Sequence, residues 1–123
     1  MLVPFQAETL ELLNATREVR IETQRAGGPL HSTIIWVVVD SDQVFVRSWK
    51  GAQARWYRET RANPDIVLLA GDQRILAAAV PAIDPESIRR CSDGFLTKYR
   101  NSKSALMMVA DDILDTTLRL EPA

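Results

Sequence analysis

The feature that most constrains the fold is an unbroken apolar run, Ile34 to Val39, within the β-branched segment Ser32 to Val39. Such residues fit an extended strand better than a helix, because a helix restricts their side-chain rotamers. Turn-forming residues bound the segment, with Gly27-Gly28-Pro29 before it and Asp40-Ser41-Asp42 after it. Because the run is apolar on both faces, we expect a central strand covered on both sides. The alternating segment Gln43 to Trp49 follows at once, which predicts an antiparallel hairpin.

The remainder of the chain supplies further strands and helices. Additional strands are predicted over residues 18–25, 66–70, 74–80 and 116–120. Helices are predicted over residues 5–16, 52–62, 84–99 and 102–110, with Asp84 as N-cap and Pro85 as first helical residue of the third. This order predicts one α+β domain over residues 1–123, built on a six-stranded antiparallel sheet with flanking helices. So small a sheet is expected to curl into a barrel, because closure hides its edges.

The distribution of charge narrows the choice of partners. The 123 residues carry 15 Lys and Arg against 16 Asp and Glu, a net charge of −1, whereas general nucleic-acid-binding proteins carry a basic excess. Residues 47–61 nevertheless hold five basic residues and one acid, which makes +4 there and leaves −5 for the rest of the chain. We therefore expect one local anion site and no nucleic-acid partner. We expect no membrane partner either, since no apolar run approaches the about 20 residues of a membrane span.

Scarce residue types limit the chemistry. The chain has one cysteine, Cys91, and one histidine, His31, which excludes an intrachain disulfide, a cysteine zinc site and a multi-histidine metal site, so no metal is predicted. His31 is either a general base or a turn residue at a strand start. Cys91 is either a thiolate favoured by Arg90 or a small buried helix residue. The N-terminus lacks a secretion signal, so we expect a cytoplasmic protein whose catalysis, if any, depends on a borrowed cofactor.

The basic segment coincides with a junction that suits an anion. A strand end, a glycine and a helix start follow one another there, which brings together free backbone N–H groups and the positive end of a helix dipole. Ser48 adds a hydroxyl, Lys50 a point charge and Arg55 a forked donor, a combination that favours a phosphate or a carboxylate. The alternative is that the arginines form only the solvated face of a short helix, with Arg55 and Glu59 as an ordinary surface ion pair.

The order of these elements resembles a known superfamily. The segments concerned are Ile35-Trp36-Val37-Val38, Val44 to Gly51, Arg55-Trp56-Tyr57, Asn63-Pro64 and the closing strand 117–120. In order and spacing they are similar to the FMN-binding split-barrel superfamily, the pyridoxamine-phosphate-oxidase-like proteins. Within it the chain most resembles a bacterial family of unknown function related to the deazaflavin-dependent nitroreductases. The resemblance implies a six-stranded split β-barrel that works as a homodimer, and an oxidoreductase with FMN or a deazaflavin in a groove between the subunits.

The same resemblance implies where a cofactor would lie. Its phosphate would lie at the end of the third strand and the following loop, and its ring system against the second strand. The residues implied are Arg47, Ser48, Lys50, Gly51 and Arg55 for the phosphate, and Thr33, Ile35 and Trp36 for the ring, with Trp49 as a ligand or subunit contact. No catalytic residue is implied. The alternative is a cofactor-free dimeric barrel that binds a small anionic ligand or a protein partner, with Trp36 and Trp49 filling the pocket.

Overall fold

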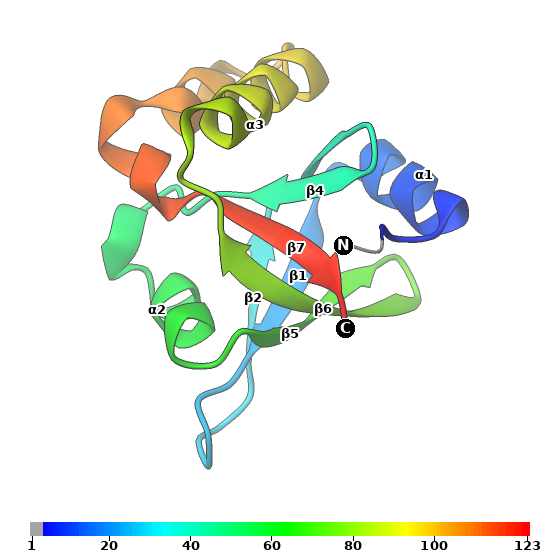
Figure 1. The fold of residues 1–123 in the computed structure, drawn as a ribbon, viewed down its shortest axis with the longest axis vertical. Helices are drawn as coiled ribbons and strands as arrows, with labels where there is room; N and C mark the ends of the chain where they lie inside the picture. Colours follow the sequence, from blue (N-terminus) through cyan, green and yellow to red (C-terminus); the bar gives the residue numbers. More distant parts are fainter. Residues whose placement is uncertain (1–3) are drawn as a thin grey trace.

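A curled antiparallel sheet forms the centre of the computed structural model, which describes residues 4–123 (Figure 1). Its seven strands are β1 (Val19–Thr23), β2 (His31–Ile35), β3 (Val38–Asp40), β4 (Gln43–Val46), β5 (Asp65–Ala70), β6 (Gln73–Pro81) and β7 (Leu118–Pro122). The α-helices are α1 (Ala7–Ala15), α2 (Arg55–Ala62) and α3 (Pro85–Lys98), and the 3-10 helices are η1 (Gly51–Gln53), η2 (Lys103–Val109) and η3 (Asp111–Thr116).

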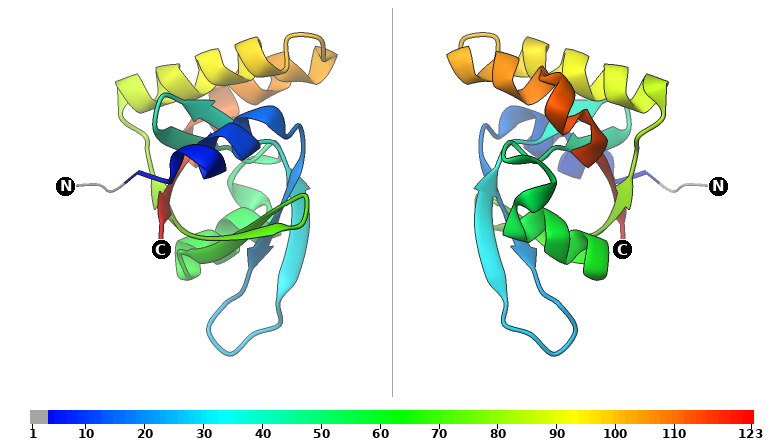
Figure 2. Two further views of the ribbon diagram at one scale, coloured as in Figure 1. Left: turned by 90° about the vertical axis from the view of Figure 1, so that its right-hand side faces the viewer. Right: turned by 90° about the vertical axis from the view of Figure 1, so that its left-hand side faces the viewer.

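The strand order is β2-β1-β5-β6-β7-β4-β3, and each neighbouring pair is antiparallel. Over residues 4–123, β2 and β3 stand at opposite edges of the sheet and do not pair with each other. The sheet is therefore an open half-barrel and not a closed barrel (Figure 2). The α+β class is as predicted, but the sheet has seven strands where six were expected.

The extra strand arises because the apolar run Ile34–Val39 is divided, which makes the prediction of one central strand wrong. Trp36 and Val37 form a bend between β2 and β3. The Val37 N–H donates to the Tyr99 hydroxyl at 3.2 Å, and the Val37 carbonyl accepts from Lys98 Nζ at 2.7 Å. A strand can leave the sheet here because these two side chains of α3 satisfy backbone groups that a partner strand would otherwise satisfy.

Burial shows which strand is covered on both faces. Ile34 in β2 is 52% exposed, so the run is not covered on both sides. The doubly covered strand is β4, where Val44 and Val46 face the inside of the curl and Phe45 packs under α3. β4 also ends at Val46 and not at Trp49.

The two predicted hairpins form, and the helices appear with shifted ends. β3 and β4 pair around a turn in which Ser41 adopts a φ of 56°, and β5 and β6 pair around Gly71 at a φ of 60°. The helix predicted over 52–62 begins as η1 and becomes α-helical at Arg55. The last strand, β7, starts two residues later than predicted and lies between β6 and β4. It thereby joins the two halves of the sheet.

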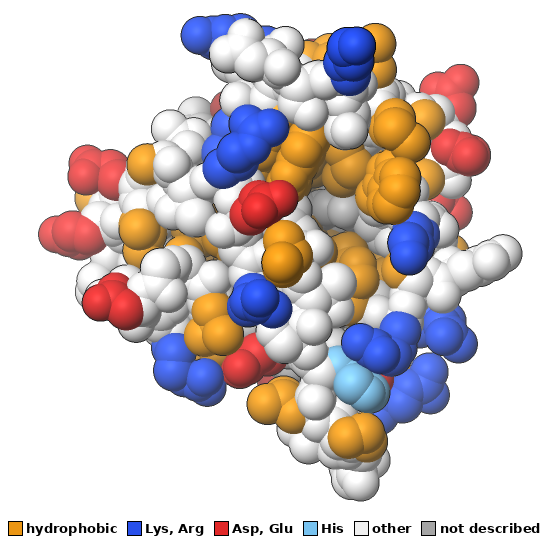
Figure 3. All heavy atoms as spheres, turned by 180° about the vertical axis from the view of Figure 1, so that it is seen from behind, with side chains coloured by type: hydrophobic (Ala, Val, Ile, Leu, Met, Phe, Trp, Pro, Cys, Tyr) orange, Lys and Arg blue, Asp and Glu red, His pale blue; other side chains and the backbone are white. Residues whose placement is uncertain are grey.

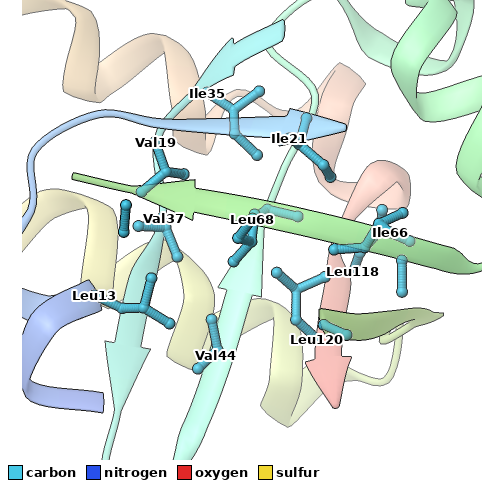
Figure 4. Packing of buried hydrophobic residues seen from close by; sticks show 14 of the residues in the cluster. Leu13, Val19, Ile21, Ile35, Val37, Val44, Ile66, Leu68, Leu118 and Leu120 are labelled. Carbon is cyan, nitrogen blue, oxygen red and sulfur yellow. The ribbon is translucent and has the colours of Figure 1, made fainter. Parts of the chain in front are cut away.

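Two apolar clusters hold these layers together. Inside the curl, Leu13, Val19, Ile21, Leu68 and Leu118 point toward one another from α1, β1, β5 and β7 (Figure 4). The second cluster lies between the outer face of the β3–β4 hairpin and the helical C-terminal half, and its residues are Val38, Phe45, Ala82, Cys91, Phe95, Tyr99, Ala105, Met108 and Ile113. Helices therefore cover the sheet on the side where β3 and β4 end it.

The longest helix, α3, approaches β3 closely at Gly94. A Cβ added to Gly94 would lie 3.0 Å from the Cβ of Val38, closer than packed carbon atoms approach. The helix begins as predicted, since the Asp84 carboxylate accepts the Ser87 N–H at 3.0 Å and Pro85 follows the cap. No helix within residues 4–123 has both the length and the apolar character needed to cross a lipid bilayer.

We predict that Gly94→Ala lowers the free energy of unfolding by about 1–3 kcal/mol, the usual cost of adding a methyl group to a packed region. The loss is expected although alanine has the higher helix propensity. Urea unfolding followed by circular dichroism measures it. Thr97→Ala changes an exposed residue of the same helix and should stay within about 0.5 kcal/mol of wild type. An unchanged Gly94→Ala midpoint would show that α3 is free to move away from Val38.

Candidate functional site

A pocket of about 620 Å³ opens on the face opposite the view of Figure 1, where apolar and basic side chains surround a hollow (Figure 3). It is lined by Glu18, Thr33, Ile34, Ile35, Trp36, Arg47, Trp49, Lys50, Ala54, Arg55, Trp56, Ser104 and Met108. The walls therefore come from β2, the loop after β4, the start of α2 and η2. Of the nine residues assigned to a cofactor site from the sequence, all but Ser48 and Gly51 line this pocket.

Several side chains give the pocket an apolar, largely aromatic wall. Trp36 stacks on Tyr99 with ring centroids 3.8 Å apart and planes 2° apart, which fixes the indole at the bend after β2. Trp56 is almost fully buried, whereas Ile34 and Trp49 are 52% and 53% exposed. Flat apolar surfaces of this kind bind ring systems by burial and stacking.

The pocket also carries uncompensated positive charge. Lys50 and Arg55 line it, both are exposed, and neither forms an ion pair within residues 4–123. Glu18 is the one acidic residue in the lining. Exposed ammonium and guanidinium groups without carboxylate partners suit a phosphate or a carboxylate, because charge-assisted hydrogen bonds are the strong ones.

Arg47 also lines the pocket, but its guanidinium is engaged inside the protein. The side chain is 1% exposed. Nε donates to Thr117 Oγ1 at 2.9 Å, one terminal nitrogen donates to Ser92 Oγ at 3.0 Å and to the Met108 carbonyl at 2.8 Å, and the other donates to the Ile88 carbonyl at 3.2 Å. Four of the five N–H groups of an arginine are thus used. Arg47 ties the end of β4 to α3, to η2 and to Thr117, the residue just before β7.

Ser48 and Gly51 shape the loop beside the pocket and do not line it. The Ser48 hydroxyl donates to the Gly51 carbonyl at 2.7 Å, and its backbone N–H donates to Thr116 Oγ1 at 3.0 Å. Gly51 has a φ of +78°, a backbone conformation that glycine adopts without strain. This turn presents the exposed residues Trp49 and Lys50 to the pocket.

A buried carboxylate next to the pocket holds the single histidine. Glu59 Oε1 accepts the Thr23 hydroxyl at 2.7 Å, and Glu59 Oε2 lies 2.8 Å from His31 Nδ1. The surface ion pair considered between Arg55 and Glu59 does not form, because the Glu59 side chain turns inward and is only 6% exposed. Burial raises the pKa of Glu59, but the hydrogen bonds from Thr23 and His31 and the charges of His31 and Arg55 outweigh it, so the pKa lies below its ordinary value.

The single cysteine is unsuited to reaction. Cys91 is fully buried in α3, and burial raises the pKa of its thiol to about 12 despite the nearby charge of Arg47. Of the two interpretations offered by the sequence, the small buried helix residue is the one that the structure supports.

Sequence reasoning missed the part of the lining that comes from distant segments. Glu18, Ser104 and Met108 join the pocket although Glu18 lies far before the basic junction in the sequence and the other two lie far after it. No local pattern marks them, because their position depends on how η2 packs against the β3–β4 side of the sheet. The link between His31 and Glu59 was equally hidden, since 28 residues separate the two.

We predict that Arg47→Lys lowers the free energy of unfolding by about 3 kcal/mol, because an ammonium cannot reach the four acceptors at once and leaves buried groups without partners. Urea unfolding of both proteins measures the difference. Lys50→Ala removes a neighbouring but exposed cation and should change stability by no more than about 0.5 kcal/mol. Wild-type stability in Arg47→Lys would contradict the structural role assigned to the guanidinium.

We predict a specific acid sensitivity from Glu59. Its carboxyl titrates near the ordinary value of 4.5 in the unfolded chain and lower in the folded protein. Its contribution to stability is therefore complete above that value and is lost as the pH falls through the folded pKa. Glu59→Gln lacks this titration, so the stability difference between wild type and variant should shrink from about pH 6 to about pH 3 in urea unfolding. A difference that stayed constant would contradict the lowered pKa.

Several solved structures have a fold similar to that of this chain. The fold is similar to that of the conserved hypothetical protein Rv2991 from Mycobacterium tuberculosis, with a TM-score of 0.71, 19% identity, and coverage of 99% of this chain and 81% of that chain. It is similar to an F420-H2 dependent reductase, FDR-A, with a TM-score of 0.64, 16% identity, and coverage of 85% and 93%. It is also similar to HutZ, the heme storage protein from Vibrio cholerae, with a TM-score of 0.65, 16% identity, and coverage of 98% and 92%.

Some other matching chains are longer, and this protein spans between 51% and 54% of their length. At these identities the likeness shows the fold alone, and this fold agrees with the split-barrel fold expected from the sequence. The comparison with curated proteins found no match. A family described as uncharacterized proteins conserved in bacteria (DUF2255) matches residues 9–120, and the chain therefore belongs to this bacterial family.

Proposed function

We propose that the protein binds a flavin or deazaflavin cofactor in its pocket and acts as a homodimeric oxidoreductase. One observation carries the proposal: an apolar, aromatic wall and two exposed, unpaired cations line the same pocket of about 620 Å³. Ligand pockets commonly fall between about 300 and about 1,000 Å³. A ligand that matches both kinds of surface has a flat ring system and an anionic group, as FMN and phosphate-bearing deazaflavins do.

The residues present fit such a group in a definite way. Lys50 and Arg55 would hold the phosphate, because they are exposed and have no carboxylate partner among residues 4–123. Thr33, Ile35 and Trp36 would lie against the ring system, as their place on and after β2 allows. Arg47 would support the wall without itself contacting the phosphate. The cofactor would supply the hydride, and the protein would bind it, orient it and exclude water from it.

The structures with a similar fold support the proposal that a cofactor binds in this pocket. One similar structure is described as an F420-H2 dependent reductase and another as a heme storage protein. Of the residue types that commonly hold heme iron, the described lining contains Met108 but no histidine, cysteine or tyrosine, and His31 lies beside the pocket with its Nδ1 on Glu59. The cofactor-free alternative expected Trp36 and Trp49 to fill the pocket, whereas the pocket beside them is open. The open pocket favours a bound ligand over the cofactor-free alternative, and Lys50 and Arg55 favour a ligand with an anionic group such as the phosphate of FMN.

A homodimer would cover the apolar rim of this site. Ile34 and Trp49 in the pocket, and Leu106 and Met107 of the neighbouring η2, are between 47% and 70% exposed. Large exposed apolar side chains that gather around one opening favour contact with another surface. A second copy of the chain is the partner we propose, and light scattering at micromolar concentration tests it directly.

We predict that FMN or the deazaflavin F420 binds the protein and quenches its tryptophan fluorescence. Lys50→Ala and Arg55→Ala should each weaken binding about tenfold or more, because each removes a charge-assisted hydrogen bond worth roughly 1.5–3 kcal/mol. Arg58→Ala changes an exposed cation of the same helix that does not line the pocket and should leave the affinity within about twofold of wild type.

Titration with hemin separates the outcomes. A Soret shift without any response to FMN or F420 would replace the proposed cofactor with heme. No response to any of the three would remove the support for a cofactor. Equal effects of Arg55→Ala and Arg58→Ala would place the ligand elsewhere than in this pocket.

A further inference from the structure

The single histidine lies next to the pocket on two independent grounds. Along β2, His31 lies two residues before Thr33, which lines the pocket together with Ile34 and Ile35, and two residues along a strand advance about 6.6 Å. On α2, Arg55 also lines the pocket, and Glu59, which holds His31, follows it by about one helical turn. The histidine, pale blue in Figure 3, lies on the same molecular face as the hollow.

The partners of Glu59 determine which ring nitrogen of His31 carries a proton. Glu59 is buried, and its oxygens face the Thr23 hydroxyl at 2.7 Å and His31 Nδ1 at 2.8 Å. An ionised carboxylate only accepts hydrogen bonds, so Nδ1 must be the donor. In the neutral ring the lone pair then lies on Nε2. Within residues 4–123 Nε2 has no hydrogen-bond partner, and the side chain is 29% exposed.

We infer that His31 is the proton donor and acceptor of this site, positioned by Glu59, and that it acts through Nε2 on a substrate bound beside β2 and Arg55. The inference rests on the proposed function. It assigns as substrate class a quinone or carbonyl compound, whose reduction ends with a proton on oxygen. A carboxylate that holds Nδ1–H keeps the ring oriented and stabilises the positive charge that it carries when protonated.

The proton and electron balance is simple. Reduction of a quinone to a hydroquinone takes two electrons and two protons. When bound, a reduced flavin-type cofactor would supply both electrons and one proton as hydride, and the protonated His31 ring would supply the second proton from Nε2–H to the substrate oxygen. The neutral ring then takes up a proton from water. The charged groups that act on Glu59 are His31 of β2 and Arg55 of α2, while β1 contributes the uncharged Thr23.

A purely structural role would have different consequences. His31 and Glu59 also connect the β1–β2 hairpin to α2. If this connection were their only role, their substitution would change stability but not the pH dependence of the reaction. The conservative variants His31→Gln and Glu59→Gln keep groups that can form hydrogen bonds at these positions, so the folded protein can be compared directly. Ser32→Ala changes an exposed residue of β2 that does not line the pocket and is the matched control.

The first measurement uses the histidine signals themselves. Because the chain has one histidine, ¹⁵N-resolved NMR reports His31 alone. We expect the Nδ1–H form in the ligand-free protein, a change toward Nε2–H in Glu59→Gln, and a shift of the ring signals when FMN is added. FMN that quenches tryptophan fluorescence while the His31 signals stay in place would overturn the inference and leave the proposed function standing.

The second measurement follows the stopped-flow reduction of menadione by protein loaded with FMN and reduced with dithionite. In wild type the rate should fall as the pH rises, because a ring without a proton on Nε2 cannot supply one to the substrate. His31→Gln should lower the rate about 100-fold and abolish this pH dependence, with FMN affinity within about threefold of wild type. Glu59→Gln should shift the pH profile, and Ser32→Ala should leave it unchanged.

Two results would overturn the inference, and they are distinguishable. A His31→Gln protein that binds FMN and retains the wild-type pH profile would show that the pair has only a structural role, and the proposed function would stand. Failure of both FMN and F420 to bind wild type would refute the proposed function, and this inference with it.

Discussion

The bonds that α3 makes to the backbone of Val37 are the constraint on which the rest of the structure depends. The Tyr99 hydroxyl accepts the Val37 N–H, and Lys98 Nζ donates to the carbonyls of both Val37 and Leu13. Burial lowers the pKa of Lys98 to about 8. The side chain is therefore held between these carbonyls as an ammonium whose pKa is only slightly above neutral pH. Because these contacts replace a strand partner, one continuous apolar run forms both edges of the sheet. The half-barrel stays open, and β2 offers a face to a ligand.

Arg47 complements that bend from the other side of the pocket. Its guanidinium binds the carbonyls of Ile88 and Met108, so the segment that carries Met108 is fixed against the end of β4. The positive charges of the junction thereby divide into two classes. Arg47 is buried and engaged in structural bonds, whereas Lys50 and Arg55 are exposed and unpaired within residues 4–123. Only the second class is available to an anion.

The sequence predicted what depends on local chemistry. Turn residues located both hairpins, Asp84 and Pro85 located the start of α3, and the basic junction located part of the pocket lining. Composition could not show that Ile34 to Val39 forms two edge strands, because an apolar residue facing a ligand pocket and one facing a core look alike in a sequence. Spacing could not show the partner of Glu59 either. The helix permits an Arg55 pair, but the folded hairpin offers Thr23 and His31, which are 36 and 28 residues away.

The pocket combines an apolar wall with two exposed cations, and together these surfaces restrict the class of ligand more strictly than either does alone. An inorganic anion would satisfy Lys50 and Arg55 but would leave Ile34 and Trp49, each more than half exposed, in contact with water. An uncharged ring would cover the apolar wall but would desolvate two cations without compensation, which is costly. A molecule with a flat ring and an anionic tail meets both demands at once. The neighbouring His31–Glu59 pair places an imidazole held by a carboxylate beside such a molecule, and it is to this group that we assign proton exchange in the proposed reduction.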